Sequence, residues 1–553
     1  MESEIKNKVI EAVKKKILTN ERGAAWITSE KSVDTKYIVR KAKKDYAGMF
    51  NEGGGTDDNR VFWPFIKSFT DSIVSNMDYD VGDIKMLSKY AKAKGTAYLL
   101  SELMRCKLRL GKFGRLMNET AHQLVRDGTV VVRTNHNDLR AKNPKSYLVD
   151  LENLWTDFND SEPTWFCERV PMNRYSVPKA WNKEVLDKSP ATKFRETGDK
   201  IHEDTVIGYR YEGLMPRGWI NGTKDEDEVY GLIWMTGLEG QGEPYVQSRR
   251  ILGKDMESCS YDFAQFVPNS NRFISVGIPE GLDQLQKYLN LVVNNRINRA
   301  NLASTGLIEV RKGSGITPQD VKYMAQGGAL VVNQIGMDIK STAVQDVSAV
   351  SFNEQSVIEA TAAQLTGSTE VSRGQINRSG TTLGQANLET GYSSQRFQYH
   401  KEALGFMFEA VLYKWMKMII ANMDDKEVVH IVDESLLREI SMNMAKYDIK
   451  QKAQMVGQNA GPMAQQQVME SPEMMDSAYN ARLKKNEWTI LKDSLKDFEY
   501  QIEISVNSEA KDLSAMANNI IQAMPLVQNN PELMQPLTDK LFEILGLSTF
   551  QFK

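Results

Sequence analysis

The stretch GIPEGLDQLQKYLNLVVNNRINRANLAST, residues 277–305, decides the fold that we expect for this chain. Asparagine and arginine occupy one side of it, and the other side carries an apolar stripe at helical spacing: Leu282, Leu285, Leu289, Val292 and Val293. We therefore predict an amphipathic helix of about 29 residues and about 43 Å, entered through a Pro-Gly turn. The short segment that follows is too small to cover such a stripe, so we expect another partner to bury it.

The chain after this helix is typical of a small insertion between two helices. We predict strands at LIEV (307–310) and ALVV (329–332), on either side of a short helix that begins at Thr317-Pro318. Helical spacing returns at 352–367. A polar, Gly-punctuated stretch then precedes a long helix that we expect from about residue 383 to about residue 423.

Upstream of residue 147 the pattern is mostly helical. MESEIKNKVIEAVKKK at the N-terminus predicts an amphipathic helix rather than a signal peptide. Residues 61–110 have helical spacing without a strand signal. A helix from about Lys112 to Gly128 then precedes a β-branched strand at 129–134, which predicts a helix packed on a sheet.

Two further regions complete the expected organisation. Between 147 and 260 we predict mostly short strands, including a hairpin of 206–213 and 229–235 around a polar tip. Near the C-terminus, 497–506 predicts a strand followed by two helices. The Gln- and Met-rich segment 451–476 fits either a mobile loop or a loosely packed helix pair.

Composition is typical of a folded protein of two to four regions: 553 residues, 41% hydrophobic and 25% charged. The 69 basic and 72 acidic residues leave a net charge of -3, which argues against tight binding of nucleic acid through phosphate neutralisation. The three cysteines, Cys106, Cys167 and Cys259, are odd in number and widely spaced, which fits a reducing cytoplasm. Lysines interrupt the apolar stretch at 410–420, so we expect no membrane span.

The sequence lacks the common catalytic and metal-binding patterns. It has no G-x-x-x-x-G-K-[ST] phosphate loop, no G-x-S-x-G elbow and no complete G-x-G-x-x-G. Its five histidines have no metal-ligand spacing, and the acidic run at 225–228 lacks the alternating ligands of a calcium loop. We therefore expect no enzyme activity, no cofactor and no metal site. A metal-dependent nuclease, suggested only by Asn135-His136-Asn137, is the least favoured alternative.

The order of elements from 261 to 423 resembles that of portal proteins, the head-to-tail connectors of tailed bacteriophages. FVPNSNRFISVGIPEGLDQLQKYLNLVVNNRINRANLASTGLIEV (266–310) resembles their passage from wing to stem, and ITPQDVKYMAQGGALVV (316–332) resembles the clip. TTLGQANLETGYSSQRF (381–397) is similar to the start of their long wing helix. VDLENLWTDFNDSEPTWFCERVPMNRYSV (149–177) is similar to another wing segment, and the C-terminal strand and helix pair resembles the crown base.

The resemblance implies an α+β, mainly helical chain with wing, stem, clip and crown regions that assembles as a ring. The short-strand region at 147–260 falls in the wing. The implied boundaries are the wing at 1–277, the stem helix at 278–306, the clip at 307–349, the returning stem helix at 350–367, the tunnel loop at 368–382, the long wing helix and the rest of the wing at 383–500, and the crown base helices at 501–553.

By this resemblance the expected function is that of a portal: a twelve-subunit ring at one capsid vertex, and a channel for genome packaging and ejection. The implied partners are further copies of the chain, the large terminase subunit, the head-tail adaptor, the major capsid protein and double-stranded DNA that passes non-specifically. The expected location is the virion, after assembly in the host cytoplasm. Another structural virion protein, such as a scaffold or tail component, is the alternative, and it would form no closed ring.

The resemblance also assigns candidate functional residues to three places. The tunnel loop is expected to touch passing phosphates, against the plainer interpretation of a flexible surface loop, through Arg373, Gln375, Asn377, Arg378 and Ser379. The stem helix offers candidates for the channel lumen or for salt bridges between subunits: Arg296 and Arg299. The clip offers candidates for contact with the motor or adaptor, against an ordinary charged surface: Arg311, Lys312, Asp320 and Lys322.

Overall fold

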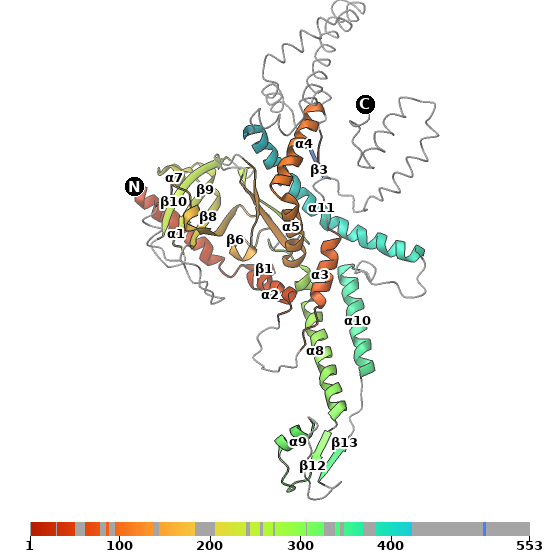
Figure 1. The fold of residues 1–553 in the computed structure, drawn as a ribbon. Helices are drawn as coiled ribbons and strands as arrows, with labels where there is room; N and C mark the ends of the chain where they lie inside the picture. The colour runs from red at the N-terminus through yellow and green to blue at the C-terminus, as the bar shows by residue number, and fades with distance from the viewer. Residues whose placement is uncertain are drawn as a thin grey trace, which may run out of the picture.

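The computed structural model has a body of helices and sheets from which one long helical hairpin projects, with a small module at its far end (Figure 1). The hairpin, which we call the stalk, consists of α8 (Ile278–Thr305) and α10 (Ser348–Thr366). The module, which we call the tip, contains β12 (Leu307–Val310), α9 (Pro318–Ala325) and β13 (Ile339–Thr342). The structure describes residues 2–28, 30–49, 61–77, 84–87, 94–135, 143–182, 205–238, 244–254, 258–268, 271–305, 307–325, 338–342, 348–368, 383–422 and 501–504.

The body contains a five-stranded antiparallel sheet in the order β10-β9-β8-β7-β6. Its strands are β6 (Leu154–Thr156), β7 (Trp165–Asn173), β8 (Thr205–Pro216), β9 (Glu228–Thr236) and β10 (Tyr245–Gly253). Helix α1 (Glu2–Thr19) covers one face, where Val9 and Val13 are fully buried in one cluster with Tyr211 and Ile233. The short α7 (Arg217–Asn221) lies between β8 and β9. The predicted N-terminal helix therefore stabilises a sheet by burying its apolar side.

The other face of this sheet shares a core with a three-stranded antiparallel sheet in the order β11-β4-β5. Its strands are β4 (Thr129–Thr134), β5 (Ser146–Leu148) and β11 (Tyr261–Gln265), and two short 3-10 helices, η3 (Leu151–Asn153) and η4 (Arg174–Ser176), lie among the connections. Val131 of β4 faces this shared core, whereas Val130 and Val132 belong to the helical core on the other side. Because β4 is buried on both faces, its sequence is a continuous apolar run.

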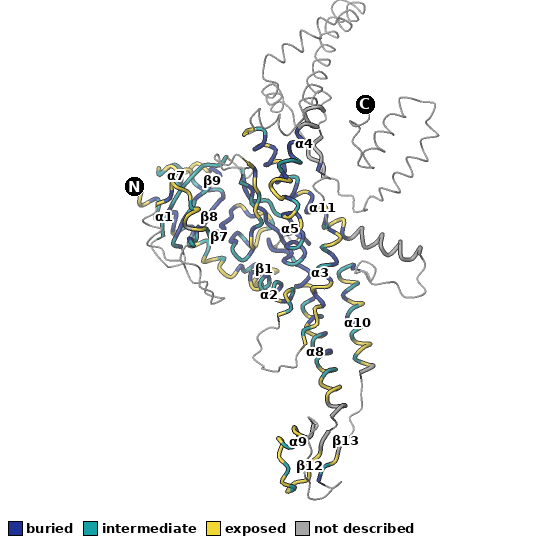
Figure 2. The backbone as a smooth tube through the Cα atoms, viewed as in Figure 1, coloured by how far each residue is buried: buried dark blue, intermediate teal, exposed yellow. Residues whose placement is uncertain are grey.

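The helical core is formed by α3 (Phe65–Ser75), α4 (Lys94–Leu110), α5 (Phe113–Asp127), α11 (Leu383–Asn422) and the base of the stalk. Trp415 of α11 is 1% exposed, and its ring centroid lies 5.2 Å from that of Phe113. Its indole N–H donates to Oγ of Ser146 at 2.8 Å, so the polar group of this buried side chain is satisfied. Figure 2 shows buried positions concentrated in the body and exposed positions along the stalk and tip.

Two small sheets attach to this body. β1 (Ala24–Thr28) pairs with β2 (Lys31–Asp34), and α2 (Thr35–Ala47) follows directly, capped by the Asp34 carboxylate that accepts from the Tyr37 N–H. β3 (Ile84–Leu87) pairs antiparallel with β14 (Gln501–Ile504), which joins segments far apart in the sequence.

The expected mixture of α and β elements is confirmed, as are the amphipathic helix at 277–305, the α5–β4 unit, the β8–β9 hairpin and the long α11. The prediction of 61–110 without a strand is wrong, because β3 lies within it and is held there by a partner from the C-terminal part of the chain. The strand predicted at 329–332 lies outside the described residues, as does 451–476. The strand that pairs with β12 is β13.

Gly128, which ends α5, permits a close approach between two backbone segments. Its φ is +80°, and a Cβ at this position would lie 2.1 Å from the carbonyl oxygen of Ser275. Gly281 of α8 has open space around it. We expect Gly128→Ala to lower the free energy of unfolding strongly, through left-handed strain and a backbone clash. We expect Gly281→Ala to raise it by about 1 kcal/mol through better helix propensity. Urea unfolding measures both, and an unchanged stability of Gly128→Ala would contradict the close approach.

Candidate assembly and channel site

The stalk begins inside the helical core and extends beyond it. α8 has 28 residues and α10 has 19, so they are about 42 Å and about 28 Å long. Leu289 of α8 and Ile358 of α10 are buried in the same apolar cluster as the body helices. Nearer the tip, the Arg296 guanidinium lies 4.1 Å from the ring centroid of Phe352. This cation–π contact sets Arg296 and Phe352 at the same level of the hairpin.

Charge-assisted bonds hold the base of the stalk. Arg272, only 2% exposed, donates to both carboxylate oxygens of Glu280 at 2.9 and 2.8 Å. Asp283 accepts from Lys41 of α2 and, at 2.9 Å, from Lys287. Burial alone would raise the pKa of Asp283, but the hydrogen bonds from Lys41 and Lys287 hold it below its ordinary value. The stalk is therefore tied both to α2 and to the loop that precedes it.

An extended segment, residues 61–64, lies along α8 just before the chain enters α3, and we call it the strap. Three amide side chains spaced four residues apart on one side of α8 bind it: Gln286, Asn290 and Asn294. The sequence already contained this spacing, but the polar side of α8 gave no sign of which segment would pair with it. The strap is thus a site that the sequence alone did not identify.

The bonds between strap and helix join the side-chain amides of α8 to backbone groups of the strap. Asn294 accepts from the N–H of Val61 at 2.8 Å and donates to its carbonyl at 3.0 Å. Asn290 accepts from the N–H of Trp63 at 3.1 Å, and Gln286 donates to the carbonyl of Trp63 at 2.7 Å. The strap is held through its backbone, so its side chains are left to make other contacts.

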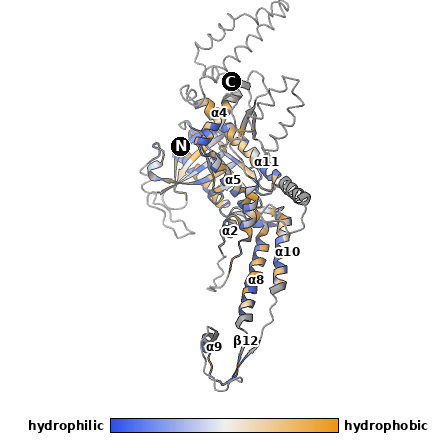
Figure 3. Cartoon of the chain, turned by 45° about the vertical axis from the view of Figure 1, so that its right-hand side comes forward, coloured by the Kyte–Doolittle hydropathy of each residue, from blue (hydrophilic) through white to orange (hydrophobic). Residues whose placement is uncertain are grey.

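Large apolar side chains remain exposed on both stalk helices. Tyr288 and Leu291 of α8 are 48% and 55% exposed. Val350, Val357 and Leu365 of α10 are 59%, 65% and 59% exposed, and their spacing of seven and eight residues places them on one face of the helix. Figure 3 shows hydrophobic residues along the length of the stalk. Grouped apolar side chains on a projecting element mark an interaction surface.

The tip is a small two-stranded sheet with one helix. β12 and β13 pair antiparallel, and the N–H of Arg311 donates to the carbonyl of Asp338 at 3.0 Å just beyond the pairing. Asp320 caps α9, because its carboxylate accepts from the N–H and the hydroxyl of Thr317 at 2.8 and 2.7 Å. Tyr323 of α9 is 60% exposed.

The structure places the predicted site residues in separate environments. The five tunnel-loop residues lie outside the described residues: Arg373, Gln375, Asn377, Arg378 and Ser379. Arg296 is half-buried against Phe352, and Arg299 is exposed about one turn nearer the tip. In the tip, Arg311 and Lys312 are exposed next to each other, Lys322 lies on α9, and Asp320 is engaged in the cap. The candidates on α8 and those in the tip thus belong to different parts of the projecting region.

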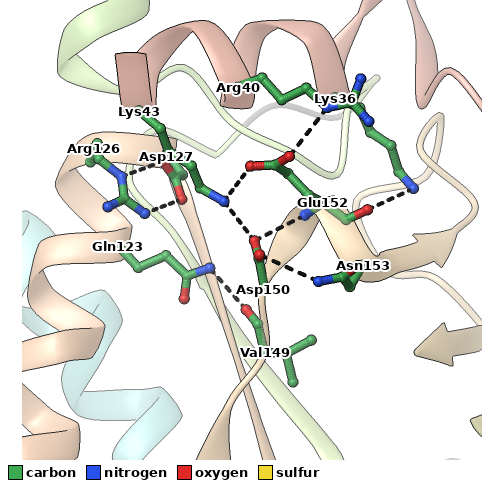
Figure 4. Close-up of polar contacts among 10 residues, drawn as sticks. All are labelled: Lys36, Arg40, Lys43, Gln123, Arg126, Asp127, Val149, Asp150, Glu152 and Asn153. Carbon is green, nitrogen blue, oxygen red and sulfur yellow. Dashed lines mark hydrogen bonds and ion pairs between the residues drawn. The ribbon is translucent and has the colours of Figure 1, made fainter. Parts of the chain in front are cut away.

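Helix α2, which holds the stalk through Lys41, is itself anchored by ion pairs to the connection between β5 and β6 (Figure 4). Lys43 Nζ lies 2.7 Å from Oδ1 of Asp150 and 2.6 Å from Oε1 of Glu152. Arg40 Nε lies 3.2 Å from Oε2 of Glu152. Lys43 and Arg40 of α2 therefore have acidic partners inside the protein, which sequence reasoning did not anticipate.

Lys36, also on α2, is the most deeply buried of these cations. It is 3% exposed, its Nζ donates to the carbonyl of Glu152 at 3.3 Å, and it lies 3.7 Å from the ring centroid of Trp155. Burial, together with repulsion from Arg40, lowers the pKa of Lys36 to about 7. Its ammonium group is stabilised by the aromatic ring and one carbonyl, which do not replace the water that burial removes.

No protein-family model matches the chain, and no curated protein is significantly similar to it. Among the residues that the structure describes, His, Cys, Asp and Glu side chains form no group of three or more able to hold a metal ion. Across the same ranges, each helix is too short or too polar to cross a bilayer.

We expect Lys36 to make stability depend on pH. Its pKa is about 7 when folded and 10.5 in a model peptide, so between these values the unfolded chain binds more protons and the free energy of unfolding rises with pH. Lys36→Met should remove this part of the rise and should stabilise the protein most below about pH 7. The free energy of unfolding of wild type and Lys36→Met is measured by urea unfolding at about pH 6 and about pH 9. Lys44→Met, at an exposed position of the same helix, is the control. The same pH dependence in both variants would contradict the assignment.

Proposed function

We propose that the chain is a portal subunit, one copy of a ring at a single capsid vertex through which the genome is packaged and ejected. The observation that carries the proposal is the stalk: two helices that project from an α+β body, carry the tip between them and expose apolar side chains. This order corresponds to the stem helix, clip, returning stem helix and long wing helix that the resemblance to portal proteins leads us to expect.

The apolar side chains exposed on the stalk support a ring, because neighbouring copies would bury them. Burying one large apolar side chain fully stabilises an assembly by about 1.5–3 kcal/mol. Within the described part of the chain, Tyr288, Leu291 and Val357 remain at least 48% exposed. A cyclic arrangement gives every copy the same two neighbours and closes without leaving an unsatisfied end. By the resemblance, the ring has twelve subunits.

Weak contact with DNA suits a channel. Duplex DNA must slide through without being held, and a net charge of -3 provides no strong general attraction for phosphate. Arg40 and Lys43 of α2 pair with acids of the body. Because the sequence lacks an ATP-binding phosphate loop, the energy for packaging would come from the large terminase subunit. The tip would be the docking site both for the large terminase subunit and for the head-tail adaptor. The major capsid protein would surround the body.

The first test is the shape of the purified protein in negative-stain micrographs. We expect closed rings with a central opening, because each copy can bury the apolar surface of its neighbour. Monomers or open filaments would favour another structural virion protein. Cleavage of DNA that depends on a divalent ion would favour the nuclease alternative.

The second test concerns the tunnel loop that the resemblance assigns to 368–382. We expect Arg373→Ala/Arg378→Ala to leave ring assembly intact and to lower the DNA content of assembled particles, because two phosphate contacts are lost. Arg115→Ala, which removes an exposed arginine of the body, serves as the matched control. Normal DNA content in the double variant would exclude the phosphate role.

A further inference from the structure

Two exposed aromatic residues lie at one level of the stalk on opposite sides of α8: Trp63 of the strap and Tyr288 of α8 itself. The backbone of Trp63 bonds to both Asn290 and Gln286, so Trp63 is level with the residue midway between them, Tyr288. A helix turns about 100° per residue, so Tyr288, two residues from each amide, leaves α8 on the side opposite the strap. Trp63 is 38% exposed and Tyr288 is 48% exposed.

α10 repeats this arrangement. Phe352 and Val350 are separated by two residues, so they leave the helix in nearly opposite directions within about 3 Å along its axis. They are 56% and 59% exposed. The contact of Arg296 with Phe352 fixes this pair near the tip end of the same stalk. Each pair therefore presents apolar side chains on two opposed sides of its own helix.

The two helices also carry charges of opposite sign. The charges of α10 are both acidic, Glu354 and Glu359, whereas the charges in residues 288–305 of α8 are both basic, Arg296 and Arg299. When two copies stand side by side, the cationic helix of one is complementary to the anionic helix of the other. A surface that complements a different surface of the same molecule makes a heterologous contact, which is the kind that forms rings.

We propose that the strap is an inter-subunit element, in which Trp63 of one copy packs on Tyr288 of the adjacent copy of this chain. The proposal rests on the ring of the proposed function, with the ring axis along the stalk. Rotation about that axis keeps every residue at its own level, so residues at one level on opposite sides of the stalk meet across the interface. Phe352 and Val350 form the corresponding contact nearer the tip.

Thiol crosslinking tests this contact in the full-length chain. In a Cys106→Ser background, where the remaining Cys167 and Cys259 are buried, a short bis-maleimide is added to assembled Trp63→Cys/Tyr288→Cys protein. We expect a ladder of covalent oligomers up to the full ring. Each single variant should give no ladder, and co-assembly of the two single variants should give dimers and nothing larger, because each chain then has one reactive thiol.

A control and a second pair make the outcome decisive. Trp63→Cys/Asn353→Cys places the second thiol at an exposed α10 position about 10 Å nearer the tip, where no ladder is expected. Phe352→Cys/Val350→Cys tests the other contact independently. Rings in micrographs without a ladder from Trp63→Cys/Tyr288→Cys would overturn the strap contact and leave the portal proposal standing, and the absence of a ladder from Phe352→Cys/Val350→Cys would overturn the contact nearer the tip. Crosslinked dimers from either single variant would show that the same residue of two copies meets at the interface, and they would also overturn the strap contact. A wild-type chain that forms no rings would overturn both proposals.

Discussion

One constraint governs this structure: helix α8 is buried in the helical core at its base and projects out of the body towards the tip. The base of α8 is buried in the helical core through residues such as Leu282 and Leu289, whereas farther along the helix α10 and the strap pack beside it. The hydrophobic effect favours burial along the whole apolar length, but a hairpin of two helices can shield only the sides that face each other. Burial at the base, the strap and the exposed side chains of α10 all follow from this constraint.

The elements that the sequence predicted well are those decided by local periodicity. The stripe containing Leu282 and Leu289 predicts α8, and the run of β-branched residues at 129–134 predicts the strand β4. The missed elements depend on partners distant in the sequence. β3 exists because β14 pairs with it, and the strap is extended because amides more than two hundred residues later bind its backbone. Local spacing carries no information about such partners.

The candidate site divides in the same way. The order of stalk and tip elements was accessible from the sequence, and so were the basic residues of α8. Their environments were not, since only the folded chain places Arg296 against Phe352 and engages Asp320 in a helix cap. Helix α2 shows the same limit: its sequence is rich in lysine and arginine, but only the folded chain pairs Lys43 and Arg40 with Asp150 and Glu152.

The strap also has a mechanical consequence. Its backbone is hydrogen-bonded to side chains spread over more than two turns of α8: Gln286, Asn290 and Asn294. The strap continues directly into α3 of the body. Rotation of α8 about its own axis would shear these bonds together rather than one after another. The helix is therefore coupled in torsion to the body, so torque applied at the tip would reach the body instead of being lost as twist within the hairpin.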